Sequence, residues 1–362
     1  MKKTTLLLFT AFAIMASAVS CQKEQIKNNI PLEGQAKESA LLSINICTPA
    51  TKAQGSEHGN SANDAKINTL EILIFNNEQG AENGLLEVYK NLSGSQLTDL
   101  SNIEITATTG AKKLFIIGNS HIGNTLRSIT KYSDFEAIES SLLSENTQDF
   151  CMTYSSETTL APVTEITAEL TRLVARVKLG SLKTNFTGTS FEGKSLEDVK
   201  IYLLNAHSNK LLYNGNAPSN STIFNYKRAK TSDYESAEMN GILYESISSP
   251  LAPLGEITSH YFYCYENLLE LETETDRYTR LVIEGKLNGT IYYYPININR
   301  EGFGYVSTTS HKGVKRNASY SINCTITGIG SNDPDEIIEN STISVDITVT
   351  EWEDVDSAEI NF

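Results

Sequence analysis

The sequence lacks the residue patterns on which most enzymes and metal sites depend. Its 5 histidines are widely separated and match neither HExxH nor any other paired-ligand spacing. It contains no GxSxG nucleophile elbow, no P-loop and no GxGxxG that follows a strand. Carboxylates are plentiful, but no pair stands apart with a physical reason for divergent pKa values. We therefore expect no catalytic residues, no metal site and no cofactor, and we predict that the protein is not an enzyme.

Positive charge and cysteine are also scarce. There are 29 basic and 44 acidic residues, which gives a formal net charge of −15 and argues against nucleic acid as a partner. Apart from Cys21, four cysteines are present and none belongs to a CxxC pair: Cys47, Cys151, Cys264 and Cys324. Buried free thiols are the simpler interpretation of these four. A disulfide after export stays open, because spacing cannot assign one.

Only one long apolar run is present, at the N-terminus. It extends from Leu6 to Val19 behind Lys2 and Lys3, and it is too short to span a bilayer comfortably. A positive start and an apolar run of this length are typical of a signal peptide. Small residues then lead into Cys21 and a polar stretch, the pattern that ends a bacterial lipoprotein signal. We predict lipidation of Cys21; the alternative is an ordinary signal peptide with an incidental cysteine.

Most of the remaining sequence alternates between apolar and polar residues, with Gly, Asn, Asp and Ser at the breaks. This period of two is typical of short strands in β-sandwiches. The predicted strands are Leu41–Thr48, Ile67–Phe75, Ile103–Thr108, Lys113–Gly118, Glu165–Leu179, Val199–Asn205, His260–Tyr265, Tyr278–Glu284, Thr290–Ile298, Ser319–Ile326 and Ile343–Thr350. One helix is predicted from Ser133 to Leu143, because Ser133 and Glu136 match a capping box before apolar residues at helical spacing.

Four further segments have weaker patterns. Pro49–Asp64 is rich in small polar residues and is predicted to be an exposed loop. The acidic segment Asp333–Glu336 does not match a calcium loop and is predicted to be a solvated turn. The aromatic runs Tyr261–Tyr263 and Tyr292–Tyr294 are of a type that can stack sugars. On alternating strands, however, such residues more often divide between the core and the sheet surface.

Several segments, taken together in order and spacing, resemble the type V pilins, the fimbrillin family of Bacteroidales-type anaerobes. The segments that carry the resemblance are Leu70–Phe75, Phe115–Asn119, Met152–Tyr154, Leu170–Val177, Tyr263–Asn267, Thr279–Gly285, Tyr294–Ile296, Arg316–Asn317, Tyr320, Thr327–Gly330 and Trp352. The resemblance implies an all-β protein with two tandem transthyretin-like β-sandwich domains and one short helix. It also implies a lipoprotein signal and a removable N-terminal strand before the first domain.

The expected domain organisation follows from this resemblance. Residues 1–20 would be the lipoprotein signal, and residues 21–52 a propeptide that carries the first strand. Residues 53–170 would form the N-terminal β-sandwich. Residues 171–362 would form the C-terminal β-sandwich with a terminal donor strand. In this family the segment Leu170–Val177 crosses between the domains.

The resemblance also implies a function as a structural subunit of a fimbrium, with a role in adhesion and biofilm formation. Such a protein is exported to the outer membrane as a lipoprotein and cut by an Arg- or Lys-specific surface protease. It then polymerises head-to-tail by donor-strand exchange with copies of itself or with related pilin subunits. Removal of a strand leaves unpaired backbone groups and an apolar groove, and a contact of this kind that does not close yields a filament.

Candidate residues for each step can be named. The displaced strand would use three alternating apolar residues, Leu42, Ile44 and Ile46. Cleavage is predicted between Lys52 and Ala53; the family is best known for Arg at this position, so the identity of the protease stays open. The donor strand would use three residues at the same spacing, Ala358, Ile360 and Phe362.

Two other functions are possible on the sequence alone. The first is a non-stalk pilus subunit, either a tip adhesin or an anchor that keeps its lipid segment. The second is a surface lipoprotein that binds glycans, for which the tyrosine runs are the only indication. Arg172 and Arg176 are alternative protease sites, but their position within apolar sequence favours a structural role, with the side-chain stems along the sheet.

Overall fold

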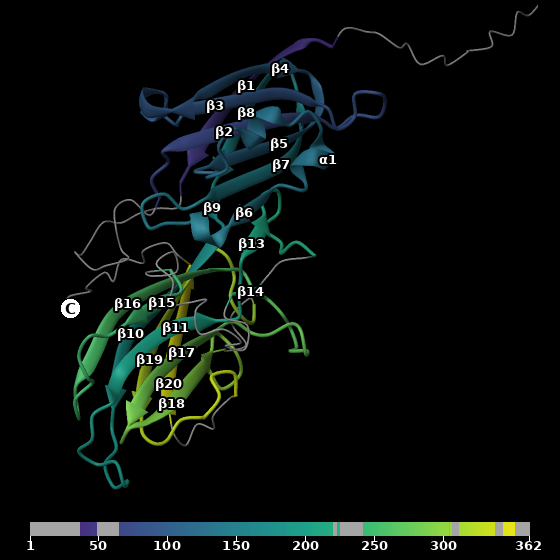
Figure 1. The fold of residues 1–362 in the computed structure, drawn as a ribbon. Helices are drawn as coiled ribbons and strands as arrows, with labels where there is room; N and C mark the ends of the chain where they lie inside the picture. The colour runs from purple at the N-terminus through teal and green to yellow at the C-terminus, as the bar shows by residue number, and fades with distance from the viewer. Residues whose placement is uncertain are drawn as a thin grey trace, which may run out of the picture. The chain divides into compact units, whose positions relative to one another are not determined.

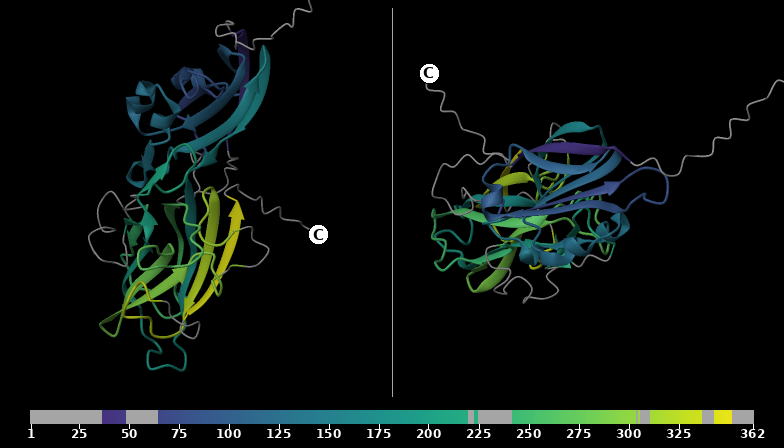
Figure 2. Two further views of the ribbon diagram at one scale, coloured as in Figure 1. Left: turned by 90° about the vertical axis from the view of Figure 1, so that its right-hand side faces the viewer. Right: turned by 90° about the horizontal axis from the view of Figure 1, so that it is seen from above.

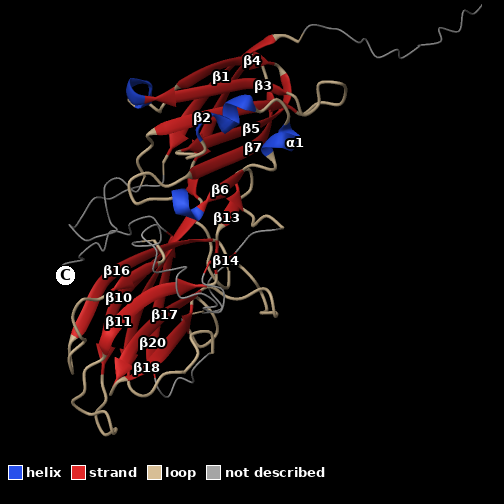
Figure 3. Ribbon diagram, in the orientation of Figure 1, coloured by secondary structure: helices blue, strands red, loops and turns tan. Residues whose placement is uncertain are grey.

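The computed structural model describes residues 37–48, 65–219, 223–224, 242–303, 305, 311–336 and 343–351. These described residues are grouped in one compact unit (Figure 1). Strands dominate, and the one α-helix among the described residues is α1 (Tyr132–Phe135; Figure 3). The predicted all-β class is therefore confirmed. The division into domains at residue 170 stays a prediction.

Two sheets form the part of the unit that precedes residue 173. The first has three strands in the order β4-β1-β8, with bounds Ile103–Thr108, Ser39–Cys47 and Val163–Glu169. The second has five strands in the order β3-β2-β5-β7-β9, with bounds Leu86–Ser93, Thr69–Asn76, Gly110–Gly118, Met152–Leu160 and Thr171–Arg172. Short 3-10 helices follow β3, β5 and β6 at Gly94–Leu97, Gly123–Ser128 and Leu142–Ser144.

The strand β2 explains how these sheets are layered, because both of its faces are apolar. Its residues Leu70, Ile72 and Ile74 belong to a buried cluster that includes side chains from β1 and β4. Its residues Leu73 and Phe75 belong to a different buried cluster that includes α1 and the 3-10 helix after β5. A strand that is buried on both faces reads as a nearly continuous apolar run rather than as an alternation. The five-stranded sheet is thus the middle layer of this part of the chain.

Two further sheets of four strands are built from residues after 173. One has the order β16-β10-β19-β20, with bounds Glu256–Tyr265, Val174–Thr184, Ala318–Ile326 and Ile343–Glu351. The other has the order β15-β11-β17-β18, with bounds Tyr244–Ser246, Glu197–Leu204, Arg280–Leu287 and Thr290–Asn297. Buried residues of both sheets, such as Phe262, Ile283 and Ile322, share one apolar cluster. This is the arrangement expected of a β-sandwich.

Short strand pairs complete the described elements. β12 (Ala206–His207) pairs with β14 (Ile223–Phe224), and β13 (Asn209–Leu211) pairs with β6 (Glu139–Ser141). The pairing of β6 with β13 corrects the predicted helix, which ends after one turn. Residues 139–141 leave the helical path because their backbone groups pair with a strand about seventy residues further along the chain.

The predicted strand Glu165–Leu179 is also corrected. It is divided among β8, β9 and β10, which belong to three different strand pairings. The sequence did not indicate the boundaries between these three strands, because the alternation of apolar and polar residues keeps its period of two where the chain passes from one sheet to another. Strands β3 and β7 were not predicted. Within the described residues, no helix is long and apolar enough to cross a membrane.

Candidate functional site: the sheet around the first strand

The candidate site is the three-stranded sheet in which β1 is the central strand. β1 runs antiparallel to β4 and parallel to β8, so it is paired along both edges. In Figure 2, β1 is the purple strand, and it is the first strand of the described part of the chain. A strand at the centre of a sheet holds its two neighbours together, and here β4 and β8 are joined only through β1. The position of β1 therefore makes it structurally important for this sheet.

The side chains of β1 alternate between the core and the surface. Leu42, Ile44 and Ile46 are 1%, 0% and 7% exposed and belong to the buried cluster between the two sheets. Leu41 lies on the opposite face and is 40% exposed. The predicted apolar face of this strand is therefore the face that the structure buries. Complete burial of a Leu or Ile side chain contributes about 1.5–3 kcal/mol each.

Main-chain hydrogen bonds hold both ends of β1. The amide of Leu41 donates to the carbonyl of Pro162 at 2.9 Å, beside the start of β8. The amide of Ile46 donates to the carbonyl of Leu100 at 2.8 Å, and the carbonyl of Cys47 accepts from the amide of Leu170 at 2.9 Å. Removal of β1 would leave the partners of these bonds unpaired and would open an apolar groove. Unpaired strand edges of this kind readily accept another strand.

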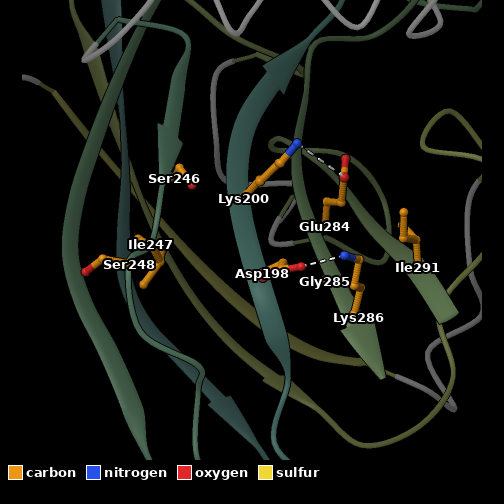
Figure 4. A pocket seen from close by; sticks show the side chains of 9 residues that line it. All are labelled: Asp198, Lys200, Ser246, Ile247, Ser248, Glu284, Gly285, Lys286 and Ile291. Carbon is orange, nitrogen blue, oxygen red and sulfur yellow. Dashed lines mark hydrogen bonds and ion pairs between the residues drawn. The ribbon is translucent and has the colours of Figure 1, made fainter. Parts of the chain in front are cut away.

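A second surface feature lies on the sheet formed by β15, β11, β17 and β18 (Figure 4). It is a cleft of about 460 Å³ lined by Asp198, Lys200, Ser246, Ile247, Ser248, Glu284, Gly285, Lys286 and Ile291. Its charges are paired with one another: Lys286 Nζ lies 2.5 Å from Asp198 Oδ2, and Lys200 Nζ lies 3.9 Å from Glu284 Oε1. Opposite charges that neutralise each other in this way give the cleft no clear preference for a charged ligand.

The tyrosine runs are mostly buried, and only Tyr292 among their tyrosines is partly exposed, so they form no continuous sugar-stacking surface. Tyr261, Tyr263 and Tyr294 are all at most 8% exposed and lie in the main apolar core. Tyr293 is 6% exposed and packs in a separate small cluster with Tyr202. Among the described residues, no group of three or more His, Cys, Asp and Glu side chains is placed to hold a metal ion.

Two protein-family models match this chain, one in each half. The model of the major fimbrial subunit protein (FimA) matches residues 40–202, which include the candidate site except Ser39. The model of the FimA4 pilin C-terminal domain matches residues 275–352. The chain belongs to the fimbrillin family. The predicted family is therefore confirmed.

Individual relatives agree with this family. This fimbrillin is 22% identical over 403 residues to the major fimbrium subunit FimA type-2 of Porphyromonas gingivalis, with 98% of each chain covered. It is 27% identical over 296 residues to the major fimbrium subunit FimC of the same species, a match that covers 79% of this chain but only 58% of FimC. Both relatives are named as fimbrium subunits, which supports the predicted class of function.

The solved structures agree on the fold. A fimbrilin (FimA) from Porphyromonas gingivalis W83 superposes with a TM-score of 0.64 at 19% identity, and the match covers 87% of this chain and 98% of that one. At this level of identity the likeness establishes a shared fold. Together with the two four-stranded sheets described above, it confirms the predicted β-sandwich architecture.

Most of the other predicted site residues of this fimbrillin lie outside the described residues. These are the lipidation site Cys21, the cleavage residues Lys52 and Ala53, and the donor residues Ala358, Ile360 and Phe362. They stay predictions. The preceding strand β20 is described and pairs with β19 along its length. Its residues Ile343 and Ile347 are buried, so β20 belongs to the sheet of its own chain.

The two arginines of the segment Leu170–Val177 are buried. Arg172 has no exposed surface, and its Nη1 donates to Asn317 Oδ1 at 3.1 Å. Arg176 is 8% exposed, and its Nε donates to Ser319 Oγ at 3.0 Å. Arg316 adds a further link, because its Nε donates to the carbonyl of Arg172 at 2.9 Å. These contacts agree with the structural role predicted for Arg172 and Arg176.

A buried carboxyl group lies close to the same segment. Glu145 Oε2 accepts from the amide of Cys151 at 2.9 Å, and Glu145 Oε1 accepts from the hydroxyl of Tyr265 at 3.1 Å. Burial disfavours the charged form and raises the pKa of Glu145 to about 7, although these hydrogen bonds act in the opposite direction. This group was not singled out in the sequence, where nothing distinguishes it from other glutamates.

The predicted solvated turn Asp333–Glu336 is wrong for two of its residues, because Pro334 and Asp335 are buried. Asp335 is 8% exposed and forms ion pairs with Arg277, at 2.6 Å, and with Arg280. Arg280 has no exposed surface and is also paired with Glu272 at 2.7 Å. Because a buried charge needs partners, Asp335 and Glu272 together make the burial of Arg280 tolerable. Residues 280 and 335 are far apart in the sequence, and nothing in it indicates that they are close in space. This ion pair could therefore not be predicted from the sequence.

The cysteines agree with the simpler of the two sequence interpretations. Cys151, Cys264 and Cys324 are buried free thiols, and Cys47 is a partly buried free thiol at the end of β1. Burial raises the pKa of Cys264 to about 12, so this thiol stays protonated near neutral pH.

Proposed function

We propose that this fimbrillin is a structural subunit of a fimbrium at the cell surface and that it polymerises by strand exchange around β1. In this proposal the precursor is complete, because its own β1 fills the groove between β4 and β8. Cleavage after Lys52 releases β1, and a strand from another subunit takes its place. The contact is head-to-tail and does not close, so repeated contacts yield a filament.

The observation that carries the proposal is the double pairing of β1. A strand at the edge of a sheet could be lost with one set of hydrogen bonds, but the loss of β1 separates β4 from β8. The protein without β1 would therefore expose two unpaired strand edges and the apolar pockets of Leu42, Ile44 and Ile46. Such a groove is stable only when another apolar strand occupies it, which favours polymer over monomer.

The proposed donor is the segment Ala358–Phe362. Its apolar residues alternate as those of β1 do, so Ala358, Ile360 and Phe362 match three consecutive pockets. Burial of Ile360 and Phe362 would contribute about 1.5–3 kcal/mol each, in addition to the main-chain hydrogen bonds. Lipidation at Cys21 would hold the precursor at the outer membrane until an Arg- or Lys-specific surface protease cuts it.

Deletion of residues 356–362 from the full precursor tests the donor segment. We expect the deleted protein to fold, to reach the surface and to be processed, but to form no fibres in electron micrographs and no ladder after mild heating. Fibres of normal length from this deletion would overturn the proposal for the donor.

A matched pair of substitutions sharpens this test. Ile360→Asp places a charge in an apolar pocket, which a buried strand does not tolerate. Asn361→Asp introduces the same group at the neighbouring position, which faces the other side of a strand. We expect the first variant to abolish the ladder and the second to keep it. Equal effects of the two would contradict a strand with one buried face.

A further inference from the structure

A lysine with no exposed surface lies in the middle sheet, outside the candidate site. Lys112 is on β5, and its Nζ contacts three oxygens: Asn76 Oδ1 at 2.6 Å, Glu87 Oε2 at 2.6 Å and Thr108 Oγ1 at 2.9 Å. Each of the four residues comes from a different strand of the unit. A buried ammonium is costly unless it is fully paired, so this arrangement requires an explanation.

The three central residues are placed together by the register of the sheet. Asn76 and Lys112 are direct cross-strand partners in the pairing of β2 with β5. Glu87 lies at the irregularity in the pairing of β2 with β3, where Ile74 pairs with Val88 and Phe75 pairs with Leu86. A bulge of this kind re-aims a side chain, and such bulges are frequent beside reactive sites. It leaves Glu87 without a cross-strand partner and directs its carboxylate to Lys112.

We propose that Lys112 and Asn76 become joined by an intramolecular isopeptide bond, with Glu87 as the proton acceptor. Lys112 Nζ lies no more than about 3.8 Å from Asn76 Cγ, since the C=O bond adds about 1.2 Å to the distance from Oδ1. A near-attack geometry needs about 3–3.5 Å, which a small rotation of the carboxamide supplies. Asn76 is itself 8% exposed, so water has little access to the reacting carbon.

The reaction balances without any external reagent. Glu87 takes one proton from the Lys112 ammonium, and the freed amine forms a bond to Asn76 Cγ. The carboxamide oxygen then carries negative charge, and Lys37 Nζ, which lies 3.4 Å from Asn76 Oδ1, stabilises it. Glu87 passes this proton to Asn76 Nδ2, and it then transfers the second proton of the attacking nitrogen in the same way. The bond from Cγ to Nδ2 breaks, and the nitrogen leaves as ammonium. The product is a secondary amide between the two side chains.

The bond would be useful to a load-bearing protein. It would join β2 to β5 covalently and would close a loop that contains β3 and β4. The sheet could then be pulled without separating these strands. The inference does not depend on strand exchange, because all of the reacting groups belong to one chain. It also predicts that the bond is already present in the precursor, since Lys37 precedes the proposed cleavage site.

Peptide mapping of the full, purified precursor tests the proposal. We expect a branched peptide that contains Asn76 and Lys112, with a mass lower by one ammonia than the sum of its parts. Trypsin should fail to cut after Lys112, since an acylated lysine is not a substrate. Complete cleavage after Lys112 and two separate peptides of unchanged mass would overturn the proposal and leave an ordinary buried ion pair.

Three conservative variants separate the loss of the bond from a failure to fold. Lys112→Arg retains the positive charge but cannot form the amide, and Glu87→Gln retains the shape but cannot accept the proton. We expect both to lack the branched peptide and to migrate more slowly on a denaturing gel. The matched control is Lys113→Arg on the same strand, where the lysine is paired with Glu157 at 3.0 Å, and it should keep the branched peptide. A branched peptide in Glu87→Gln would contradict the role of Glu87.

Discussion

Ile44 lies directly opposite Ile103 in the antiparallel pair of β1 and β4, and it lies opposite Ile166 in the parallel pair of β1 and β8. Ile44 has no exposed surface, and Ile103 is 5% exposed. The centre of β1 is thus also the centre of an apolar contact among three strands. A substitution at residue 44 therefore reports whether β1 is present.

Ile44→Ala should destabilise the precursor by about 2–5 kcal/mol, because it removes buried methyl groups and leaves a cavity. Denaturant unfolding of the purified precursor measures this change. The control is Leu41→Ala on the exposed face of the same strand, which should change the free energy of unfolding by no more than about 0.5 kcal/mol. The same Ile44→Ala change should leave the heat stability of mature polymer unaltered, since the proposed cleavage removes β1 from it. A weakened polymer would mean that β1 is retained.

Limited digestion of the folded precursor with trypsin should cut after Lys52 well before Arg172. Arg172 is fully buried and hydrogen-bonded, and a protease needs an accessible, extended backbone. N-terminal sequencing of the first fragments measures the order of cleavage. Early cleavage at Arg172 would show that the segment Leu170–Val177 opens more readily than its contacts imply.

Glu145 should make the protein less stable as the pH rises. Its pKa in the folded protein is about 7 against an ordinary value of 4.5, so the folded state binds the proton more tightly than the unfolded chain. The contribution of this group is most favourable below pH 4.5 and is lost as the pH rises to about 7, by up to about 3 kcal/mol. Glu145→Gln should remove this slope.

The measurement is the free energy of unfolding of both proteins between pH 4.5 and 8. Glu157→Gln is a suitable control, because Glu157 is exposed and its pKa is lowered by Lys113. It should leave the slope in this window unchanged. An identical pH dependence for Glu145→Gln and the unsubstituted protein would show that the burial of Glu145 does not govern its ionisation.

Asp335→Ala should destabilise the protein by about 3 kcal/mol, because it leaves the buried Arg280 with only one carboxylate partner. Thermal unfolding measures the loss. Asn332→Ala, in the same segment but exposed, should change the midpoint little. Equal midpoints for the two variants would mean that Glu272 alone satisfies Arg280.

The alternation of apolar and polar residues was sufficient to predict a strand where one face of that strand is buried and the other is exposed. Ile103–Thr108 was predicted with the bounds that β4 has, because its residues alternate strictly between core and surface. The buried face of β1 was predicted for the same reason. β3 was missed because most of its residues are only partly buried, which weakens the alternation. Period alone thus identifies strands with one buried face.

Contacts between distant segments were beyond the reach of the sequence. The predicted helix after Ser133 is replaced beyond its first turn by the pairing of β6 with β13. In the predicted turn, Asp335 is buried because it forms an ion pair with Arg280. A lysine is normally a surface residue, so the sequence does not indicate that Lys112 is buried. The register of β2 and β5 places it opposite Asn76. Such positions depend on tertiary structure, which a single sequence does not display.

The most direct test of strand exchange is a disulfide between two subunits. Ile103→Cys and Ile360→Cys are introduced together, so that a donor strand in the place of β1 brings the two thiols opposite each other. We predict a ladder of covalent oligomers on a denaturing gel without reductant, which collapses to monomer when reductant is added. The control pairs Ile360→Cys with Glu104→Cys, which is exposed on the other face of β4 and should give no ladder. Monomer alone from the first pair, or equal ladders from both, would contradict the account.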